Sequence, residues 1–264
     1  MPIGVFDSGI GGLTVASALH RLIQGEDIIY LGDTARVPYG TKSVQTVRRY
    51  ALECALFLLN KGVKLIVVAC NTASAVAMPE LREILRVPLI GVVDPGVEAA
   101  LKLSKTSKIG VIGTPATISS NAYQKRLKEL APQARVYAKS CPLLVPLAEE
   151  GSLEGPIVEL VLDDYLGSLR KRHIDALILG CTHYPLFKPA ISKLMGDDVK
   201  LVDSAETTAL AVKEALLREG LLRTHGKGSV RCYVTDMPRS YNQLTSLFFR
   251  KKVSKVSKVA LVGG

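Results

Sequence analysis

The sequence lacks any long uninterrupted hydrophobic run. Its apolar stretches, such as KLIVVAC at 64–70 and DALILGC at 175–181, are far shorter than the roughly 20 residues that a membrane-spanning helix needs. The first residues, MPIGVFDSGIGG, also lack the basic region followed by an apolar stretch that marks a secretory signal. We therefore expect no membrane association, and the simplest prediction of location is cytoplasmic.

Cysteine is present, but without the spacing of a disulfide framework or a zinc site. The cysteines are odd in number and no two form a Cys-x-x-Cys pair; they are Cys54, Cys70, Cys141, Cys181 and Cys232. A chain of 264 residues can form a core without covalent crosslinks, so reduced thiols are expected. Zinc is not expected, because Cys181 and His183 form the only close cysteine–histidine pair. No metal is therefore predicted.

Acidic residues are outnumbered by basic ones, 24 to 34, which gives a formal net charge of +10. The excess is concentrated between Lys213 and Lys258, where eleven Lys and Arg residues accompany three acidic ones. A basic segment of this kind can bind nucleic acid. It carries no zinc-finger or RNA-binding signature, however, so a solvated basic surface is the simpler interpretation and a nucleic-acid partner is disfavoured.

Hydrophobic patterning alternates along the chain between strand-like and helix-like segments. Short runs rich in β-branched residues predict strands at 3–6, 27–31, 64–69, 88–93, 108–113, 134–138 and 175–180. Longer amphipathic stretches predict helices at 12–23, 44–62 and 157–172. Alternation of this kind is typical of an α/β fold with parallel sheets flanked by helices, in which functional residues lie at the carboxyl ends of the strands.

A weak internal repeat indicates two similar units. The segment IGVFDSGIGG at 3–12 resembles IGVIGTPATI at 109–118, and LIVVACNTA at 65–73 resembles LILGCTHYP at 177–185. Self-similarity over this length predicts two α/β units that face each other across a cleft. No low-complexity linker separates them. We predict that residues 1–95 and 208–264 form the first domain and that residues 96–207 form the second.

The repeat places Cys70 and Cys181 at equivalent strand ends. From opposite sides of one cleft, one thiolate can remove a proton from a carbon acid while one thiol returns a proton to the other face, which inverts the stereocentre. The ordinary pKa of a thiol, about 8.5, suits this task. Both cysteines are expected to begin a helix, whose backbone N–H groups favour the anion. Asn71, Thr72 and Thr182 would then donate hydrogen bonds to a carboxylate.

The glycine-rich loop DSGIGG at 7–12 joins a predicted strand to a predicted helix. A dinucleotide-binding fingerprint would need a third glycine where Thr14 stands, so that interpretation is weak. The alternative places Asp7 and Ser8 in the cleft, with Asp7 near the first thiol. Three cysteines have no such partners and are predicted to be core residues, as free cysteine commonly is: Cys54, Cys141 and Cys232.

Five segments together resemble the glutamate racemases of the cofactor-independent aspartate/glutamate racemase family: FDSGIGGLTV, GDTARVPYGTKS, ACNTASA, GTPATISSNAY and LGCTHYP. They occur in the family's order between residue 5 and about residue 210. The resemblance implies two similar domains with the active site between them. It also implies interconversion of L- and D-glutamate without pyridoxal phosphate or any other cofactor, a supply of D-glutamate for peptidoglycan, and commonly a homodimer.

The resemblance also implies roles for individual residues. Cys70 would act on the D-enantiomer with the help of Asp7, and Cys181 on the L-enantiomer. Glu149 and His183 would assist Cys181. The implied substrate-binding residues are Asp7, Ser8, Tyr39, Gly40, Asn71, Thr72, Thr114, Thr117, Thr182 and His183.

Alternatives remain open at the level of sequence. Aspartate racemases of the same family share the cysteine pair, although CTHYP together with VPYG favours glutamate. A two-lobed protein that only binds an amino acid is a further alternative, but binding a polar ligand does not require two thiols. Glu150 is adjacent to Glu149 and is the alternative partner of the second thiol.

Overall fold

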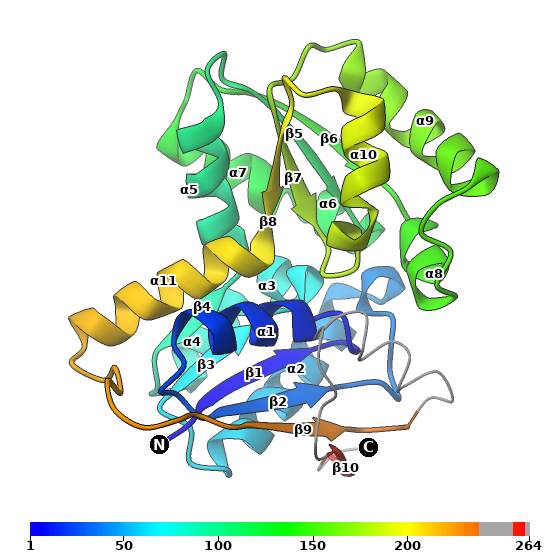
Figure 1. Cartoon of the computed structure of the whole chain (residues 1–264). Coiled ribbons are helices and arrows are strands. Elements are labelled where there is room, and N and C mark those ends of the chain that lie inside the picture. Colours follow the sequence, from blue (N-terminus) through cyan, green and yellow to red (C-terminus); the bar gives the residue numbers. More distant parts are fainter. Residues whose placement is uncertain (238–255, 262–264) are drawn as a thin grey trace.

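The computed structural model describes residues 1–237 and 256–261, and in that part of the chain the strands form two parallel sheets (Figure 1). The first sheet is built from β1 (Ile3–Asp7), β2 (Ile28–Gly32), β3 (Leu65–Val68), β4 (Leu89–Gly91), β9 (Val230–Val234) and β10 (Val256–Lys258). The second is built from β5 (Lys108–Gly113), β6 (Arg135–Ser140), β7 (Ala176–Gly180) and β8 (Lys200–Asp203). Every pair of neighbouring strands is parallel.

Helices cover both faces of each sheet. The first sheet packs against α1 (Leu13–Leu22) and α11 (Ser204–Arg218) on one face, and on the other against α2 (Val44–Leu59), α3 (Asn71–Val76) and α4 (Met78–Ile84). The second packs against α5 (Val93–Leu103) and α7 (Ala122–Leu130) on one face, and on the other against α8 (Leu144–Glu149), α9 (Pro156–Arg170) and α10 (Lys188–Met195). The strands β1, β2, β3 and β7 are buried along their whole length, as their uninterrupted apolar sequences require. The predicted α/β class is confirmed.

The internal repeat corresponds to a repeated topology. The first sheet has the order β10–β9–β2–β1–β3–β4 and the second has the order β6–β5–β7–β8. The run β2–β1–β3–β4 therefore has the same connectivity as the whole second sheet. In this correspondence β1 matches β5 and β3 matches β7, so the segments after β3 and β7, which carry Cys70 and Cys181, occupy equivalent positions.

Three strands were not anticipated from the sequence. β8 lies where the sequence suggested only a crossing between units, and β9 and β10 extend the first sheet at its edge. All three are partly exposed, so they lack the continuous apolar run by which the buried strands were recognised. β4 also ends earlier than predicted, because Val93 already begins α5.

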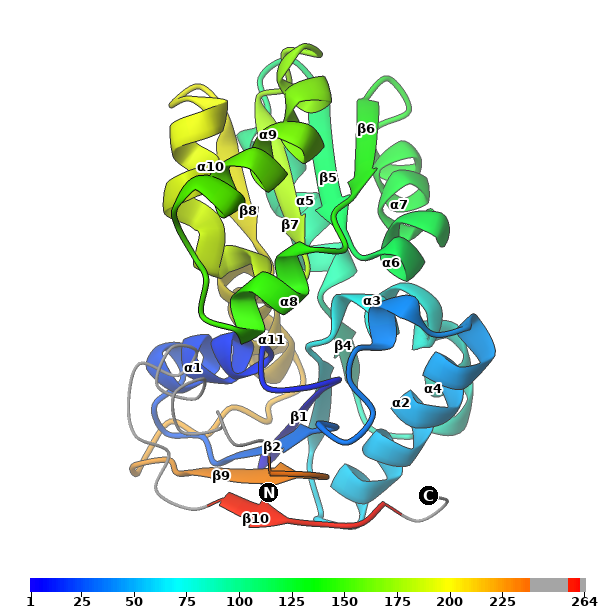
Figure 2. The same ribbon diagram turned by 90° about the vertical axis from the view of Figure 1, so that its right-hand side faces the viewer.

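Both crossings between the sheets are helical. The predicted domain boundaries, at 95/96 and 207/208, fall inside α5 and α11, and the division itself stays a prediction. Figures 1 and 2 show the two sheets one above the other, with α3 and α6 (Pro115–Ser119) where the units meet. There η1 (Tyr39–Thr41) contacts both α3 and α6. Within the described ranges, no helix combines the length and the apolar character needed to cross a membrane.

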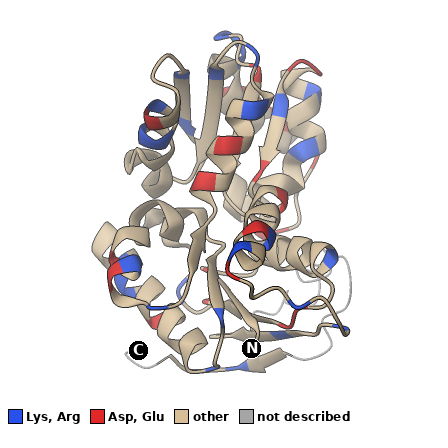
Figure 3. Ribbon diagram, turned by 90° about the vertical axis from the view of Figure 1, so that its left-hand side faces the viewer, with Lys and Arg blue, Asp and Glu red and all other residues tan. Residues whose placement is uncertain are grey.

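Charged residues are distributed over both units. Figure 3 shows acidic and basic positions interspersed on the ribbon, and several of them form ion pairs, such as Arg21 with Glu206 and Lys258 with Asp236. Much of the basic segment between Lys213 and Lys258, namely residues 238–255, lies outside the described residues. The prediction that disfavours nucleic acid is therefore untested.

Candidate active site

A small cavity lies between the carboxyl ends of the two sheets and is lined by both units. Its volume is about 20 Å³, which leaves room for about one water molecule. Most of the residues predicted for the site line it, and they are Ser8, Tyr39, Gly40, Cys70, Asn71, Thr72, Thr114, Cys181, Thr182 and His183. The carboxyl ends of β1, β3, β5 and β7 thus converge on one point, as a parallel fold requires.

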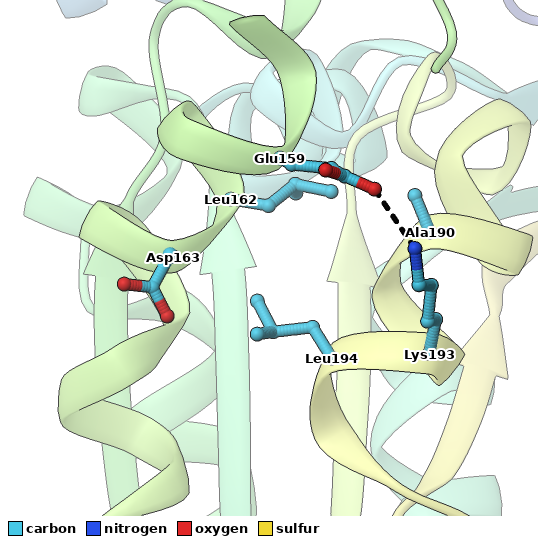
Figure 4. A pocket seen from close by; sticks show the side chains of 6 residues that line it. All are labelled: Glu159, Leu162, Asp163, Ala190, Lys193 and Leu194. Atoms are coloured by element: carbon cyan, nitrogen blue, oxygen red, sulfur yellow. Dashed lines mark hydrogen bonds and ion pairs between the residues drawn. The ribbon is translucent and has the colours of Figure 1, made fainter. Parts of the chain in front are cut away.

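A larger surface cavity lies elsewhere, between α9 and α10 (Figure 4). Its volume is about 280 Å³. Its lining residues are Glu159, Leu162, Asp163, Ala190, Lys193 and Leu194. Glu159 and Lys193 form an ion pair of 2.9 Å across it, and none of the predicted site residues reaches it. The two predicted catalytic thiols and His183 line the small cavity instead.

Cys70 immediately precedes α3 and caps its N-terminus, as predicted. Its Sγ accepts a hydrogen bond from the backbone N–H of Ala73 at 3.5 Å and lies 3.6 Å from Oγ of Ser8. Burial, reinforced by the nearby carboxyl of Asp7, raises the pKa of the Cys70 thiol to about 12. Cys70 is therefore a neutral thiol at physiological pH and able to donate a proton.

Asp7 ends β1 and is fully buried beside the first thiol. Its Oδ2 accepts hydrogen bonds from the backbone N–H groups of Gly9 at 3.1 Å and Gly12 at 3.0 Å. Burial raises the pKa of Asp7, although the positive charge of His183 and these N–H groups oppose the shift. A Cβ on Gly12 would lie 2.5 Å from Cβ of Asp7, so the glycine-rich loop is needed for the chain to pass this close to the carboxyl group.

The second thiol has a histidine as its neighbour. Sγ of Cys181 lies 3.8 Å from Nδ1 of His183, and Nε2 of His183 lies 3.4 Å from Oε1 of Glu149. Burial alone would lower the pKa of His183, but its contacts with Cys181 and Glu149 outweigh burial and raise the pKa to about 10. The imidazole is therefore protonated at neutral pH. The carboxylate that reaches it is that of Glu149, the predicted residue.

The expectation that Cys181 begins a helix is wrong. The chain turns after β7 and first forms η2 (Tyr184–Phe187), and α10 follows only at Lys188. The tight turn brings His183 back onto the thiol, so a positively charged side chain stands where the sequence suggested helix N–H groups.

Three threonine hydroxyls connect the two units. Oγ1 of Thr72 lies 2.9 Å from Oγ1 of Thr114 and 3.2 Å from Oγ1 of Thr117, and the last two are 3.0 Å apart. Thr117 is buried and does not line the cavity itself, but its hydroxyl belongs to this cluster. The hydroxyls can reorient and supply donors to a ligand that carries carboxylate groups.

Tyr39 and Gly40 form the wall contributed by η1. The Tyr39 hydroxyl donates a hydrogen bond to Oδ2 of Asp33, which also forms an ion pair of 2.7 Å with Arg36. A Cβ on Gly40 would lie 2.5 Å from Cβ of Thr114. This glycine therefore allows the first unit to touch the second directly at the cavity.

Sequence reasoning missed the apolar part of the lining. Val37, Pro38 and Val145 contact the same space. They carry no chemically reactive group. The only signal in the sequence is their position: Val37 and Pro38 directly precede Tyr39, and Val145 lies in α8, which follows β6. They narrow the cavity.

The remaining cysteines are core residues. Cys54, Cys141 and Cys232 are buried free thiols, as predicted, and burial raises the pKa of each. All five cysteines of the chain are unpaired. Among the residues that the structure describes, no group of three or more His, Cys, Asp or Glu side chains is arranged to hold a metal ion.

Two thiols and a protonated imidazole line one cavity, with the carboxyl group of Asp7 beside the first thiol, and this arrangement is suited to proton transfer. The model of the Asp/Glu/Hydantoin racemase family matches residues 3–212. The chain therefore belongs to the Asp/Glu/Hydantoin racemase family, and the resemblance seen in the sequence is confirmed.

Individual relatives are similar to this protein over nearly the whole chain. A glutamate racemase of Geobacter metallireducens is 48% identical over 98% of this chain and 96% of its own length. One from Aquifex pyrophilus is 52% identical over 94% of this chain and 93% of its own. The crystal structure of glutamate racemase from Francisella tularensis in complex with D-glutamate has a TM-score of 0.94 and 43% identity, covering 100% of this chain and 98% of that one.

Proposed function

We propose that this protein is a glutamate racemase that interconverts L- and D-glutamate by proton transfer between two cysteines. The observation that carries the proposal is that Cys70 and Cys181, at equivalent strand ends of two similar sheets, line one cavity. The names of its close relatives support glutamate as the substrate.

In the L-to-D direction, Cys181 acts as a thiolate and removes the α-proton of L-glutamate. The C–H bond breaks, the S–H bond of Cys181 forms, and the electron pair stays on the α-carbon and its carboxylate. Cys70 then gives its proton to the opposite face of the carbon and becomes the thiolate. The D-to-L direction is the reverse, so no redox partner is needed.

The surroundings of the thiols support this assignment. The protonated His183, 3.8 Å from Cys181, stabilises negative charge on that sulfur. Cys70 has a pKa raised to about 12, so it begins as the proton donor. Glu149 holds His183 from behind. Asp7 stands beside Cys70 and is placed to assist that thiol when the direction reverses.

The alternative substrate is aspartate, which is one methylene shorter. The test is incubation of the purified protein with L-glutamate in heavy water, with ellipticity followed by circular dichroism and the α-proton by NMR. Loss of ellipticity together with deuterium at the α-carbon is expected. Turnover of L-aspartate but not of L-glutamate would identify aspartate as the substrate. A folded protein that is inert to both amino acids would overturn the proposal.

Three further features rest on the family resemblance: a supply of D-glutamate for peptidoglycan, a cytoplasmic location and a homodimer. The oligomeric state can be measured directly by light scattering during size-exclusion chromatography. A mass of one chain, 28.4 kDa, rather than two would contradict the expected homodimer.

A further inference from the structure

The side chain of Asn71, beside the first thiol, is held from behind by two buried hydroxyl groups. Its Nδ2 donates hydrogen bonds to the hydroxyl oxygen of Tyr123 at 2.8 Å and to Oγ of Ser204 at 3.2 Å. All three residues are at most 3% exposed. Tyr123 belongs to α7 of the second unit, and Ser204 is the first residue of the crossing helix α11.

The same contacts determine which way the Asn71 carboxamide faces. Oγ of Ser204 donates its single proton to the backbone carbonyl of Leu179 at 3.3 Å, so towards Asn71 it can only accept. The atom facing Ser204 must therefore be the nitrogen. Both N–H groups of the carboxamide are then used, and Oδ1 is a buried acceptor with no hydrogen-bond partner among the described residues.

Tyr123 also contacts the segment that carries the second thiol. A Cβ on Gly180, the residue before Cys181, would lie 3.4 Å from Cε2 of Tyr123, and a Cβ on Gly96 of α5 would lie 3.7 Å from its Cε1. The ring is therefore packed against the end of β7 and the crossing helix α5, while its hydroxyl holds Asn71. One side chain thus touches both thiol-bearing segments.

We propose that Tyr123 and Ser204 are positioning residues that keep Oδ1 of Asn71 available to the ligand, where it accepts an N–H from the α-ammonium group of the amino acid. This inference rests on the proposed racemase function. It changes the role expected from the sequence, in which Asn71 was a donor to a carboxylate. A carboxamide that has used both N–H groups presents only an acceptor, which attracts an ammonium group and repels a carboxylate.

The test is a double-mutant cycle on steady-state racemisation. Tyr123→Phe removes one acceptor of the Asn71 amide and is expected to lower kcat/KM about tenfold, the worth of one hydrogen bond to a charged ligand. The loss should lie mainly in KM, since the contact is present in bound substrate and transition state alike. In an Asn71→Ala background the same substitution should change kcat/KM by less than about twofold, because Tyr123 acts through Asn71.

Ser204 provides an independent variant. Ser204→Ala should show the same loss centred on KM, and Ser204→Thr, which keeps the hydroxyl, should recover most of the activity. If Asn71→Ala is too slow to assay, the two Ser204 variants and the KM effect of Tyr123→Phe test the positioning role. A loss confined to kcat, or no recovery in Ser204→Thr, would overturn the proposal.

A matched control separates positioning from general destabilisation. Tyr165→Phe deletes another partly buried hydroxyl of the second unit, which accepts a hydrogen bond from the N–H of Leu143 at 3.3 Å, and should leave KM unchanged. Equal effects of Tyr123→Phe with and without Asn71 would contradict the coupling. Wild-type protein inert to glutamate and aspartate would instead refute the racemase function itself, so the two failures are distinguishable.

Discussion

The two thiols of the cavity differ in their immediate neighbours. Cys70 lies beside the carboxyl group of Asp7, and Cys181 lies beside the protonated imidazole of His183. One thiol therefore has a carboxyl group as its neighbour and the other a positive charge. The proposed two-base inversion needs such an asymmetry, and the fold provides it without substrate.

Replacing either thiol should abolish racemisation. Cys70→Ser and Cys181→Ser each substitute a hydroxyl that is far less acidic, so turnover should fall by about 10²–10⁴ or more, the typical contribution of a general acid or base. The measurement is the decay of ellipticity of L- and D-glutamate. Cys232→Ser, in the core on β9, is the control and should lower the unfolding temperature while keeping activity. Full turnover in either site variant would contradict the two-base mechanism.

The raised pKa of His183 predicts a pH dependence of stability. Its pKa is about 10 in the folded protein and about 6.5 in an unfolded chain, so the folded state binds the additional proton between these values. The stabilisation is fully present below about pH 6.5 and is lost as the pH rises through about 10.

Urea unfolding can isolate the contribution of His183. Between about pH 6.5 and 8.5 the wild-type free energy of unfolding should fall with pH, and His183→Gln should flatten that slope. Buried thiols such as Cys70 contribute with the same sign only above about pH 8.5, where unfolded thiols ionise. Identical slopes in the two proteins would show that His183 is not protonated in the folded state.

The residues that could be predicted from the sequence are those with reactive side chains. Cys70, Cys181 and Asp7 could be proposed from their places at strand ends, because reactive side chains are unusual there. The orientation of Asn71 could not be predicted, because it depends on Ser204, 133 residues further along the chain, which donates its proton to the carbonyl of Leu179. The number of free N–H groups on a side chain is a property of the folded structure.

At the scale of elements, short loops carry the close contacts between the units. η1 presents Gly40 directly to Thr114 of the second unit, and the loop after β1 presents Gly11 to Thr182, where an added Cβ would lie 2.5 Å from Oγ1. Both contacts join a glycine to a threonine at the end of a strand. The two units thus fit closely against each other at the cavity.

Gly40→Ala should prevent this approach. The added Cβ would meet Cβ of Thr114, an atom fixed to the backbone, so the units must move apart. We expect kcat/KM to fall by about tenfold or more, because small displacements of reacting groups are costly. Gly167→Ala in α9, where nothing lies within 4 Å, is the control and should stabilise by about 0.5–1 kcal/mol without loss of activity. Wild-type kinetics in Gly40→Ala would show that the contact is dispensable.

Element boundaries were predictable where burial dominates. The strand 108–113 was predicted with the bounds that β5 has, because it is apolar and mostly buried. β8, β9 and β10 were missed because their side chains are only partly buried, so these segments lack the continuous apolar run of the central strands. The turn after Cys181 was mistaken for a helix start because Pro185 and the apolar residues after it suit both.

At the scale of the whole molecule, the site belongs to neither unit alone. The cavity is lined by residues of both, the threonine cluster crosses between them, and α5 and α11 connect them twice. A volume of about 20 Å³ is far below the several hundred Å³ of ordinary ligand pockets. The cavity must therefore widen to admit an amino acid.

This geometry predicts that substrate stabilises both units together. A ligand bound only by the folded protein adds about 2.7 kcal/mol at one hundred times its dissociation constant. Because residues of both units line the cavity, D-glutamate should raise the unfolding temperature of the whole chain in a single calorimetric transition. D-Aspartate at the same concentration should raise it less if glutamate is the substrate. Two transitions, of which only one moves with ligand, would show that one unit binds the substrate alone, and the shared cavity would then not be the binding site.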